Sequence, residues 1–450
     1  MIKYNKRDCS NSKNPHLGVW GLLFSFFGLS AQPVFTLPQC VKTGIENNLS
    51  LKQSQLVQES AQASLFQSKM ALLPSLNAFA GQSWGFGRSL DPVNYRFVNS
   101  EIETNNFSIN SNLTLFNGFK QINSVRMNES KSLQSKTDVE QAKQQLTMEI
   151  VQAYAQVLYN QSVVEAAENQ ENSTALQVAK TSKMLQAGTL SPSKLYDLEA
   201  RLASDRLLVI EYTNQLRLSR LVLMQLLNIS PVPDSFKLEP IENQAYEPVE
   251  NEPTAFTGHF SVQSARYQLQ YAERNLSASR GGFTPRLSMS AGINTLYSDA
   301  QIKPTTGKPY GFSEQLNNNL YQSVSLNLSI PLFNQWFSHS QVQQAAIQRK
   351  NAAIQLDISK QKLQKLSQSA QQEWQAAQMK KQATQQQLKA AEQAYQSVQS
   401  RFNAGMADGT EYYVSSGLYF KARSEHLQAD YDLTLKTILY QYYKTGRFNF

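Results

Sequence analysis

The stretch Leu113-Thr-Leu-Phe-Asn-Gly-Phe119 returns later in the chain as Ile330-Pro-Leu-Phe-Asn-Gln-Trp336, at an offset of 217 in the numbering. The same offset relates Gln186-Ala-Gly188-Thr to Asn403-Ala-Gly405-Met. Upstream, Leu73-Pro-Ser-Leu matches Thr284-Pro-Arg-Leu at an offset of 211, which predicts a longer loop between residues 298 and 318. Self-similarity at a fixed spacing indicates a duplicated unit. We therefore predict two repeats, 36–228 and 256–445, a Pro/Glu-rich connector over 229–255, and a C-terminal tail over 446–450.

Each repeat predicts the same order of elements. A helix over about 38–72, or 256–281, ends at a proline. Two strands separated by a polar loop follow, and alternation with a period of two is clearest in the second strand of each pair. Its apolar positions are Phe107, Ile109, Leu113 and Leu115 in the first copy and Val324, Leu326, Leu328, Ile330 and Leu332 in the second.

After the second strand, the apolar period becomes helical for about 65 residues, up to Gly188 in one copy and Gly405 in the other. At 1.5 Å per residue, each helix would be roughly 95–100 Å long. Their apolar stripes are narrow, and the other faces carry Gln, Ser, Asn and Lys. This pattern fits the wall of a water-filled tube, and a simple long coiled coil is the alternative.

The four strands alternate polar and apolar residues, which is typical of an outer-membrane β-barrel with an apolar face toward lipid. A barrel in hydrocarbon cannot leave an open edge, and the smallest such barrels have about eight strands. One chain therefore cannot close a barrel, and several copies must contribute strands. A soluble sandwich is the alternative, but it needs a second apolar layer, which the sequence lacks. Aromatic residues at the strand-to-helix junctions predict a membrane-interface belt of Phe116, Phe119, Phe333, Trp336 and Phe337.

The N-terminus has basic residues, an apolar run over 17–31 and a small residue, Ala31, in that order. We interpret residues 1–31 as a secretory signal peptide, with a short membrane anchor or a lipoprotein signal as alternatives. Its removal lowers the formal charge from +8 to about +5 and leaves Cys40 as the remaining cysteine. After residue 31, no apolar run is long enough for a membrane helix. Nucleic-acid binding would require a dense cluster of Lys and Arg interleaved with aromatic residues, and the sequence contains no such cluster.

The chain resembles the TolC-like outer-membrane factor family in five features. They are the signal peptide, the start Leu37-Pro-Gln-Cys-Val, Leu73-Pro-Ser-Leu before a strand, Leu115-Phe-Asn-Gly before a long helix, and a glycine at each far turn. The resemblance implies a mainly α fold with a membrane β-barrel part: a trimer with a twelve-stranded barrel, four strands per chain, continuing into a long α-helical coiled-coil barrel. It implies a cell outer-membrane location with a periplasmic extension in a Gram-negative cell. It also implies partnership with a periplasmic adaptor and an inner-membrane transporter, or with a type I secretion apparatus. The function expected is an exit duct for small molecules or secreted substrates, with a non-enzymatic coiled-coil scaffold as the alternative.

The two far turns carry the residues that the resemblance assigns to contact with the adaptor. These candidates are Gly188, Thr189, Leu190, Gly405, Met406 and Ala407. A plain helical hairpin explains the glycines equally well, because glycine adopts the left-handed conformation that ends a helix.

Family members narrow the periplasmic end with acidic rings, and Glu411 matches one acidic position here, whereas Val414 and Ala407 depart from the pattern. We hypothesise that Glu411, with Asp408, forms a carboxylate ring that opposes closure and binds cations. Ordinary solvated surface charge is the alternative.

The sequence offers no pattern for catalysis, for metal binding or for a cofactor. The four histidines are far apart, and no Gly-rich phosphate loop follows a strand. We therefore expect a protein that is not an enzyme and holds no metal and no cofactor.

Overall fold

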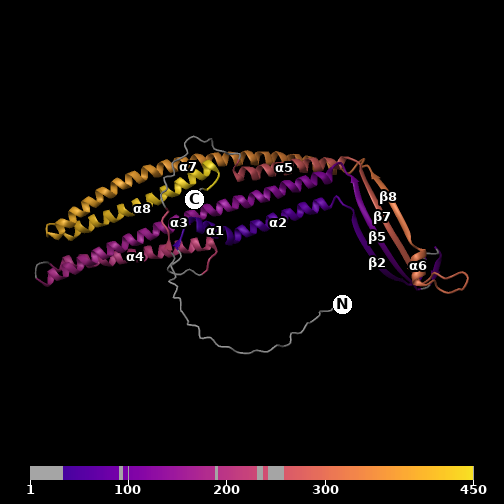
Figure 1. Cartoon of the computed structure of the whole chain (residues 1–450), viewed down its shortest axis with the longest axis horizontal. Coiled ribbons are helices and arrows are strands. Elements are labelled where there is room, and N and C mark those ends of the chain that lie inside the picture. The colour runs from indigo at the N-terminus through magenta and orange to yellow at the C-terminus, as the bar shows by residue number, and fades with distance from the viewer. Residues whose placement is uncertain are drawn as a thin grey trace, which may run out of the picture.

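The computed structural model describes residues 34–90, 95–99, 101–187, 191–230, 237–241 and 258–448. The predicted signal peptide and most of the predicted connector lie outside these residues. The molecule is elongated, with a β-sheet at one end and the far ends of the long helices at the other (Figure 1).

Two long helices run from the sheet to the opposite end. Helices α3 (Lys120–Gln186) and α7 (Phe337–Asn403) have 67 residues each, and their first residues are related by the offset found in the sequence. Each is followed by a shorter helix that returns beside it, α4 (Pro192–Leu227) and α8 (Gly409–Thr445), and the starts of this pair are related by the same offset. At 1.5 Å per residue, α3 and α7 are roughly 100 Å long. The structure thus confirms the internal repeat and the long helices.

The predicted first helix of each copy is found with one difference. In the second copy it is α5 (Phe260–Arg280), followed by the short 3₁₀ helix η2 (Gly281–Phe283). In the first copy, Asn48 divides it into α1 (Leu37–Asn47) and α2 (Leu49–Met70). Asn48 has an extended backbone, its side chain accepts a hydrogen bond from Leu51 N, and its amide donates to the Leu226 carbonyl. A single helix over 38–72 was therefore a wrong prediction, because the Asn48 side chain caps a new helix.

The sheet joins the two copies. Strands β2 (Ser75–Gly85), β5 (Ile102–Phe116), β7 (Arg286–Ser298) and β8 (Tyr321–Ser329) lie in the order β2-β5-β7-β8, and every pair is antiparallel. Each copy supplies one hairpin, and β5 pairs with β7 across the repeat. Strands β2 and β8 form the two edges of this sheet.

The polar loops at the far end of the sheet contain structure that periodicity did not predict. The short strands β3 (Arg88–Leu90) and β4 (Phe97–Asn99) pair beyond the end of the β2–β5 hairpin. The loop after β7 contains α6 (Phe312–Asn318), whose Gln315 side chain is buried and bonds both the amide and the carbonyl of Ser298. These tertiary hydrogen bonds order a polar segment that has no apolar period of its own.

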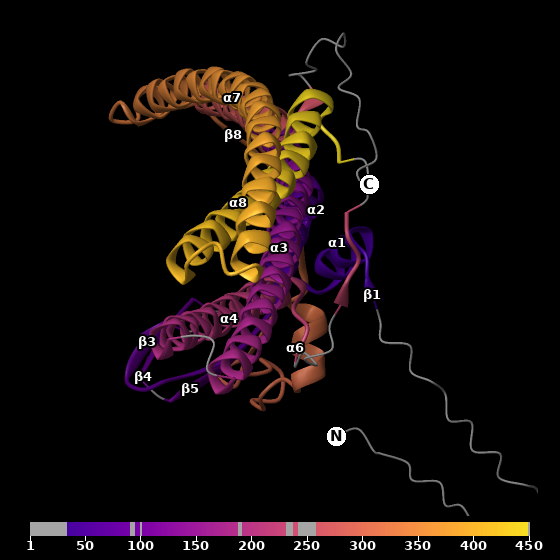
Figure 2. The same cartoon turned by 90° about the vertical axis from the view of Figure 1, so that its left-hand side faces the viewer.

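The helices form a curved wall that continues the sheet (Figure 2). Near the sheet, α2 packs on α3, α3 on α5 and α5 on α7, which repeats the order of the strands that they join. Beyond the middle, α4 lies on α3, α3 contacts α8, and α8 lies on α7. Buried alanines spaced by seven residues, Ala370 and Ala377 of α7 and Ala422 and Ala429 of α8, indicate coiled-coil packing.

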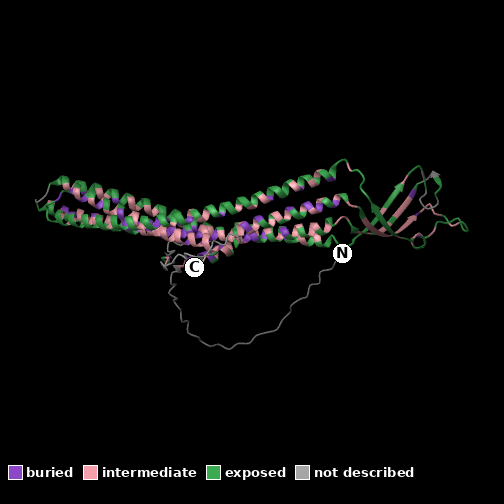
Figure 3. Ribbon diagram, turned by 90° about the horizontal axis from the view of Figure 1, so that it is seen from above, coloured by how far each residue is buried: buried purple, intermediate pink, exposed green. Residues whose placement is uncertain are grey.

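The main hydrophobic core lies at the middle of this wall (Figure 3). We call it the equatorial cluster; it consists of Leu37, Cys40, Val41, Leu51, Val139, Leu146, Ile150, Val151, Ala153, Tyr154, Val157, Leu158, Val164, Leu216, Leu223, Met224, Leu227, Leu238 and Ile438. Beside it, β1 (Val34–Phe35) pairs in parallel with β6 (Lys237–Leu238), which brings part of the predicted connector onto the helices. The Tyr154 hydroxyl lies within hydrogen-bond distance of the carbonyls of Phe35 and Glu239 and joins these segments to α3.

The half of the wall away from the sheet has a much smaller core. We call it the tip cluster; it consists of Leu198, Val398 and Tyr412, with Val178, Tyr395 and Phe402 packed against them. The Tyr395 and Tyr412 hydroxyls lie 3.0 Å apart.

Candidate functional site: the sheet, the junction and the tip

One face of the four-stranded sheet is apolar across all strands. The register places Phe107 opposite Ala80 and Thr295, and Met289 opposite Leu113 and Leu326. Its apolar residues are Leu76, Ala78, Ala80, Phe107, Ile109, Leu113, Leu287, Met289, Ala291, Ile293, Val324, Leu326 and Leu328, and the same register adds the polar residues Ser111, Thr295 and Gln322 to this face. Much of it is open to solvent in the single chain; Leu326, for example, is 66% exposed.

A bulge corrects one predicted position on this face. The register between β5 and β7 shifts after Thr114, so that Phe116 pairs with Leu287 and Leu115 is the extra residue. Leu115 was predicted to lie on the apolar face, but Phe116 takes this place. A bulge changes the side to which the following residues point, and alternation alone does not reveal it.

The opposite face of the sheet carries amides and hydroxyls. It includes Asn77, Ser108, Asn110, Asn112, Ser288, Ser290, Asn294, Ser323, Ser325 and Asn327, with Phe79, Tyr321 and Leu296 as exceptions. Arg286, at the first position of β7, shares this face and approaches Thr114 Oγ1 at 3.5 Å. The sheet therefore separates an apolar environment from a polar, nearly uncharged one.

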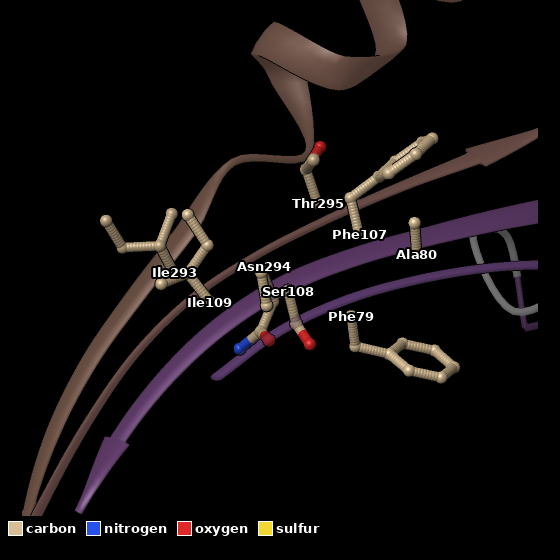
Figure 4. A pocket seen from close by; sticks show the side chains of 9 residues that line it. Phe79, Ala80, Phe107, Ser108, Ile109, Ile293, Asn294 and Thr295 are labelled. Atoms are coloured by element: carbon tan, nitrogen blue, oxygen red, sulfur yellow. The ribbon is translucent and has the colours of Figure 1, made fainter. Parts of the chain in front are cut away.

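A shallow hollow at the centre of the sheet is lined by residues of both faces. In Figure 4, Phe107, Ala80 and Thr295 point to one side of the strands, whereas Ser108, Asn294 and Phe79 point to the other. Helix α6 covers the outer end of the apolar face, where the Phe312 ring contacts the rings of Phe107 and Tyr297. This cover leaves the remainder of the apolar face open.

The strand-to-helix junction has the same unusual backbone in both copies. Gly118 and Phe119 in one, and Gln335 and Trp336 in the other, have positive φ angles. The preceding asparagines cap the long helices: Asn117 Oδ1 accepts from Gln121 N at 3.3 Å, and Asn334 Oδ1 from Ser338 N at 3.5 Å. Left-handed conformations are uncommon outside glycine, so their repetition marks a turn geometry that the duplicated unit keeps in both copies.

The predicted aromatic belt lies at this junction. Its five members, Phe116, Phe119, Phe333, Trp336 and Phe337, are all exposed in the single chain, with Trp336 at 64%. Phe116 and Phe119 contact each other edge to face, with ring centroids 5.5 Å apart. Phe116 and Phe119 thus lie where β5 passes into α3, and Phe333, Trp336 and Phe337 lie where β8 passes into α7.

The second of the two tips lies within the described residues, whereas the turn of the first does not. Gly188, Thr189 and Leu190 lie outside the described residues. At the second tip, Gly405 has a φ of +78°, and Met406 is 72% exposed. Ala407, by contrast, is only 8% exposed, so its side chain offers little surface for a partner.

The two candidate gate carboxylates have partners within their own chain. Asp408 is the N-cap of α8, and its Oδ1 accepts a hydrogen bond from Glu411 N at 2.7 Å. The Glu411 carboxylate forms an ion pair with Arg401 at the end of α7. A partner within the chain reduces the net charge that Glu411 would bring to a ring.

A polar network near the tip was not predicted from the sequence. Asp205 on α4 is 1% exposed; it accepts a hydrogen bond from Thr174 Oγ1 at 2.7 Å, and Arg201 Nε lies 2.9 Å from its Oδ1 without hydrogen-bond geometry. Gln170 Nε2 donates to Ser416 Oγ on α8 at 2.6 Å and lies 3.3 Å from Thr174 Oγ1. The network joins α3, α4 and α8. The spacing of Arg201 and Asp205 by four residues was its one signal in the sequence.

Within the described ranges, no helix is both long enough and apolar enough to cross a bilayer. In the same part of the chain, no group of three or more His, Cys, Asp or Glu side chains could hold a metal ion. Burial raises the pKa of the Cys40 thiol to about 12, so this cysteine stays protonated in the equatorial cluster.

Comparisons with known proteins agree with this architecture. The model of the outer membrane efflux protein family matches residues 41–228 and 254–438. No curated protein sequence matches the chain.

Solved structures of similar fold include three membrane proteins. The transmembrane channel protein CusC has a TM-score of 0.78 and 17% identity, with 90% of this chain and 91% of that chain covered. VceC, an outer membrane protein of Vibrio cholerae, has a TM-score of 0.74 and 15% identity, with coverage of 90% and 96%. The Campylobacter jejuni CmeC outer membrane channel has a TM-score of 0.76 and 16% identity, with coverage of 91% and 85%. At these identities, the likeness is one of fold.

Proposed function

Because the chain belongs to the outer membrane efflux protein family, we propose that it forms an exit duct through the outer membrane. Three copies place their sheets side by side and close a twelve-stranded barrel. The helices below each sheet join those of the neighbouring copies in a tunnel that extends into the periplasm. The polar face of the sheet lines the conduit, and the apolar face contacts lipid.

The observation that carries this proposal is a four-stranded sheet with a predominantly apolar face, whose edge strands β2 and β8 each lack a second partner strand among the described residues. In hydrocarbon, unpaired backbone N–H and C=O groups at a sheet edge are each costly by several kcal/mol. Pairing β8 of one copy with β2 of the next satisfies these groups without any change in the sheet. Closure by several copies therefore explains both the edges and the exposed apolar face.

The helical wall supports the same assembly. The order α2-α3-α5-α7 follows the order of the strands, so a closed ring of strands continues directly into a closed ring of helices. Exposed apolar side chains recur on the two outer helices, Leu49 and Leu56 on α2 and Ile347, Ile354 and Ile358 on α7. Neighbouring copies would bury these stripes against each other.

We expect the far end of the tunnel to work with a periplasmic adaptor and an inner-membrane transporter. The contact candidates are the tip residues Gly188, Thr189, Leu190, Gly405 and Met406; Ala407 contributes its backbone. Glu411 and Asp408 lie one to two turns from Gly405 and would tune the opening at this end. The aromatic belt would mark the periplasmic boundary of the membrane.

Two single substitutions on adjacent residues of β8 test this function. Leu326→Arg places a charge on the apolar face, and Ser325→Arg places the same charge on the polar face. An Arg that faces lipid near the bilayer midplane costs about 2–4 kcal/mol, whereas one in the lumen is tolerated. In outer-membrane fractions run on unboiled gels, we expect L326R to lose most of the heat-sensitive trimer and S325R to keep it.

Single-channel recording in planar bilayers completes the test, because the wild-type trimer should conduct. A soluble protein, or a membrane monomer that heating does not alter, would contradict the duct and favour a coiled-coil scaffold. Equal trimer yields for L326R and S325R would contradict the assignment of the two faces.

A further inference from the structure

The level at which the sheet meets the helices carries positive charge without any acidic residue. The four segments that cross it are 66–75, 116–126, 278–288 and 329–340. They contain Lys69, Lys120, Arg126, Arg280 and Arg286, and no Asp or Glu. Uncompensated charge of one sign creates a local potential that attracts the opposite sign.

The opposite end of the sheet does not share this bias. Its described segments, 82–90, 95–99, 101–105 and 294–321, contain four acids and four Lys or Arg residues. One of these acids, Glu314, pairs with Lys303 at 2.7 Å. The excess of positive charge is therefore a property of the junction and not of strand ends in general.

Three of the cations lie on chain segments that touch each other. The Gln121 side chain, next to Lys120, donates to the carbonyl of Ala71, two residues after Lys69. A Cβ placed on Gly281, next to Arg280, would lie 3.3 Å from Lys120 Cβ. Lys69, Lys120 and Arg280 thus occupy the ends of α2, α3 and α5 at one level.

These three side chains are free to bind an external anion. Each is exposed, and none takes part in an ion pair between described residues. The nearest acid on the helix of Lys120 is Glu129, and that on the helix of Arg280 is Glu273. At 1.5 Å per residue, these acids are roughly 10 Å or more away. Arg286 is not part of this group because it lies on the polar face of the sheet.

Exposed apolar side chains flank each cation. Met70, Leu72 and Leu73 follow Lys69, Phe119 precedes Lys120, and Phe283 follows Arg280. A phosphate head with hydrocarbon chains matches this pairing of charge and apolar surface, whereas a free phosphate ion would use only the charge.

We propose that Lys69, Lys120 and Arg280 bind the headgroup of an anionic phospholipid in the periplasmic leaflet of the outer membrane. This inference rests on the proposed function, which places the junction at that leaflet. The bound lipid neutralises the charge at the junction, and its acyl chains cover the neighbouring apolar side chains. Each protomer supplies one such site.

Native mass spectrometry of the full-length folded protein in zwitterionic detergent tests the proposal. The protein is titrated with phosphatidylglycerol or with phosphatidylcholine of the same acyl chains. We expect wild type to prefer phosphatidylglycerol and K69Q/K120Q/R280Q to bind it at least roughly tenfold more weakly, since each basic residue contributes to anionic-lipid binding. The matched control K362Q/K365Q/K389Q removes three exposed lysines of α7 and should keep the preference.

The variant K69R/K120R/R280K keeps all three charges and should keep the preference, even if the glutamine variant folds poorly. Loss of the preference in this variant, an equal loss in the α7 control, or no loss in K69Q/K120Q/R280Q would overturn the proposal. Displacement of phosphatidylglycerol by millimolar inorganic phosphate would instead assign a free-anion site. A trimer that conducts but shows no lipid preference refutes this inference alone, whereas absence of a trimer refutes the duct.

Discussion

The middle of the molecule and its tip half are built from the same long helices but are held together differently. The equatorial cluster packs nineteen buried side chains, most of them large aliphatic residues, from α1, α2, α3, α4, α8 and β6. The tip cluster has three buried members, and a polar network around Asp205 lies beside it. Hydrophobic burial scales with the area removed from water, so the equator gains far more from packing than the tip does.

The difference indicates where the wall can change shape. Large buried aliphatic contacts fix the equator, because each rearrangement there would open a cavity. At the tip, α4 and α8 make few direct contacts with each other, and each is joined to α3 by a side-chain hydrogen bond, from Thr174 to Asp205 of α4 and from Gln170 to Ser416 of α8. We expect the two hairpins to separate at the tip before the equator loosens.

The largest effect should follow from removing a buried side chain at the equator. Leu223 of α4 is fully buried, and Leu223→Ala should lower the free energy of unfolding by about 2–5 kcal/mol. Chemical denaturation in detergent measures this change. Leu176→Ala, at a position 72% exposed on α3, is the control and should change stability by less than about 0.5 kcal/mol. Similar losses for the two variants would mean that the equatorial cluster does not dominate stability.

A smaller and local effect should follow at the tip from Asp205→Asn. The amide keeps an acceptor for Thr174 but loses the charge that faces Arg201, and breaking such a buried network costs about 1–3 kcal/mol. Hydrogen exchange should become faster in α4 and α8 near the tip and stay unchanged around Leu223. Faster exchange at the equator as well would show that the two regions unfold together. Asp197→Asn, on the same helix, serves as the control substitution.

The sequence predicted the regular parts of both regions. The repeat at a constant offset and the change of period from two to helical located the strands, the long helices and the hairpin turns, because these signals lie within single elements. The break at Asn48 was missed, since a capping side chain leaves no mark on periodicity. Helix α6 was missed because Gln315 orders it through contacts with a strand.

The candidate site was less accessible to sequence reasoning. Its aromatic residues were identified because they follow the strands directly, and their role as a membrane-interface belt stays a prediction. The Asp205 network joins residues from three helices, and no local pattern specifies which helices meet. The partner of Glu411 was missed for the same reason, because Arg401 lies on the other side of the tip turn.

Lowering the pH should destabilise the equator and so narrow the difference in stability between the equator and the tip. The His259 ring lies edge-on to Tyr442 of α8, next to the equatorial cluster, and burial lowers the pKa of this histidine from its ordinary 6.5. Below pH 6.5 the unfolded chain binds a proton that the folded chain does not. Stability therefore falls with decreasing pH by at most about 1.4 kcal/mol per pH unit, until the folded pKa is reached.

Denaturation of wild type and His259→Phe between pH 7.5 and 5 checks this expectation. The variant keeps an aromatic ring against Tyr442 and should show a flatter pH profile than wild type. If wild type is as stable at pH 5 as at pH 7.5, or if the two profiles are parallel, His259 does not set the pH dependence of the equator.

The smallest change in stability should follow from substituting Arg401 or Glu411, and these variants are also the most informative about the tip. Both side chains are more than 40% exposed, so their ion pair contributes at most about 1 kcal/mol to stability and weakens with salt.

The effect of this ion pair on ion conduction should be easier to detect than its effect on stability. If Glu411 contributes to a carboxylate ring, Arg401→Gln frees that charge and should raise cation selectivity, whereas Glu411→Gln should lower it. Reversal potentials of single channels in a low-salt gradient measure both changes. The double variant should resemble Glu411→Gln, because Arg401 acts in this scheme through the carboxylate; selectivity that Arg401→Gln raises equally with and without Glu411 would remove Glu411 from the gate.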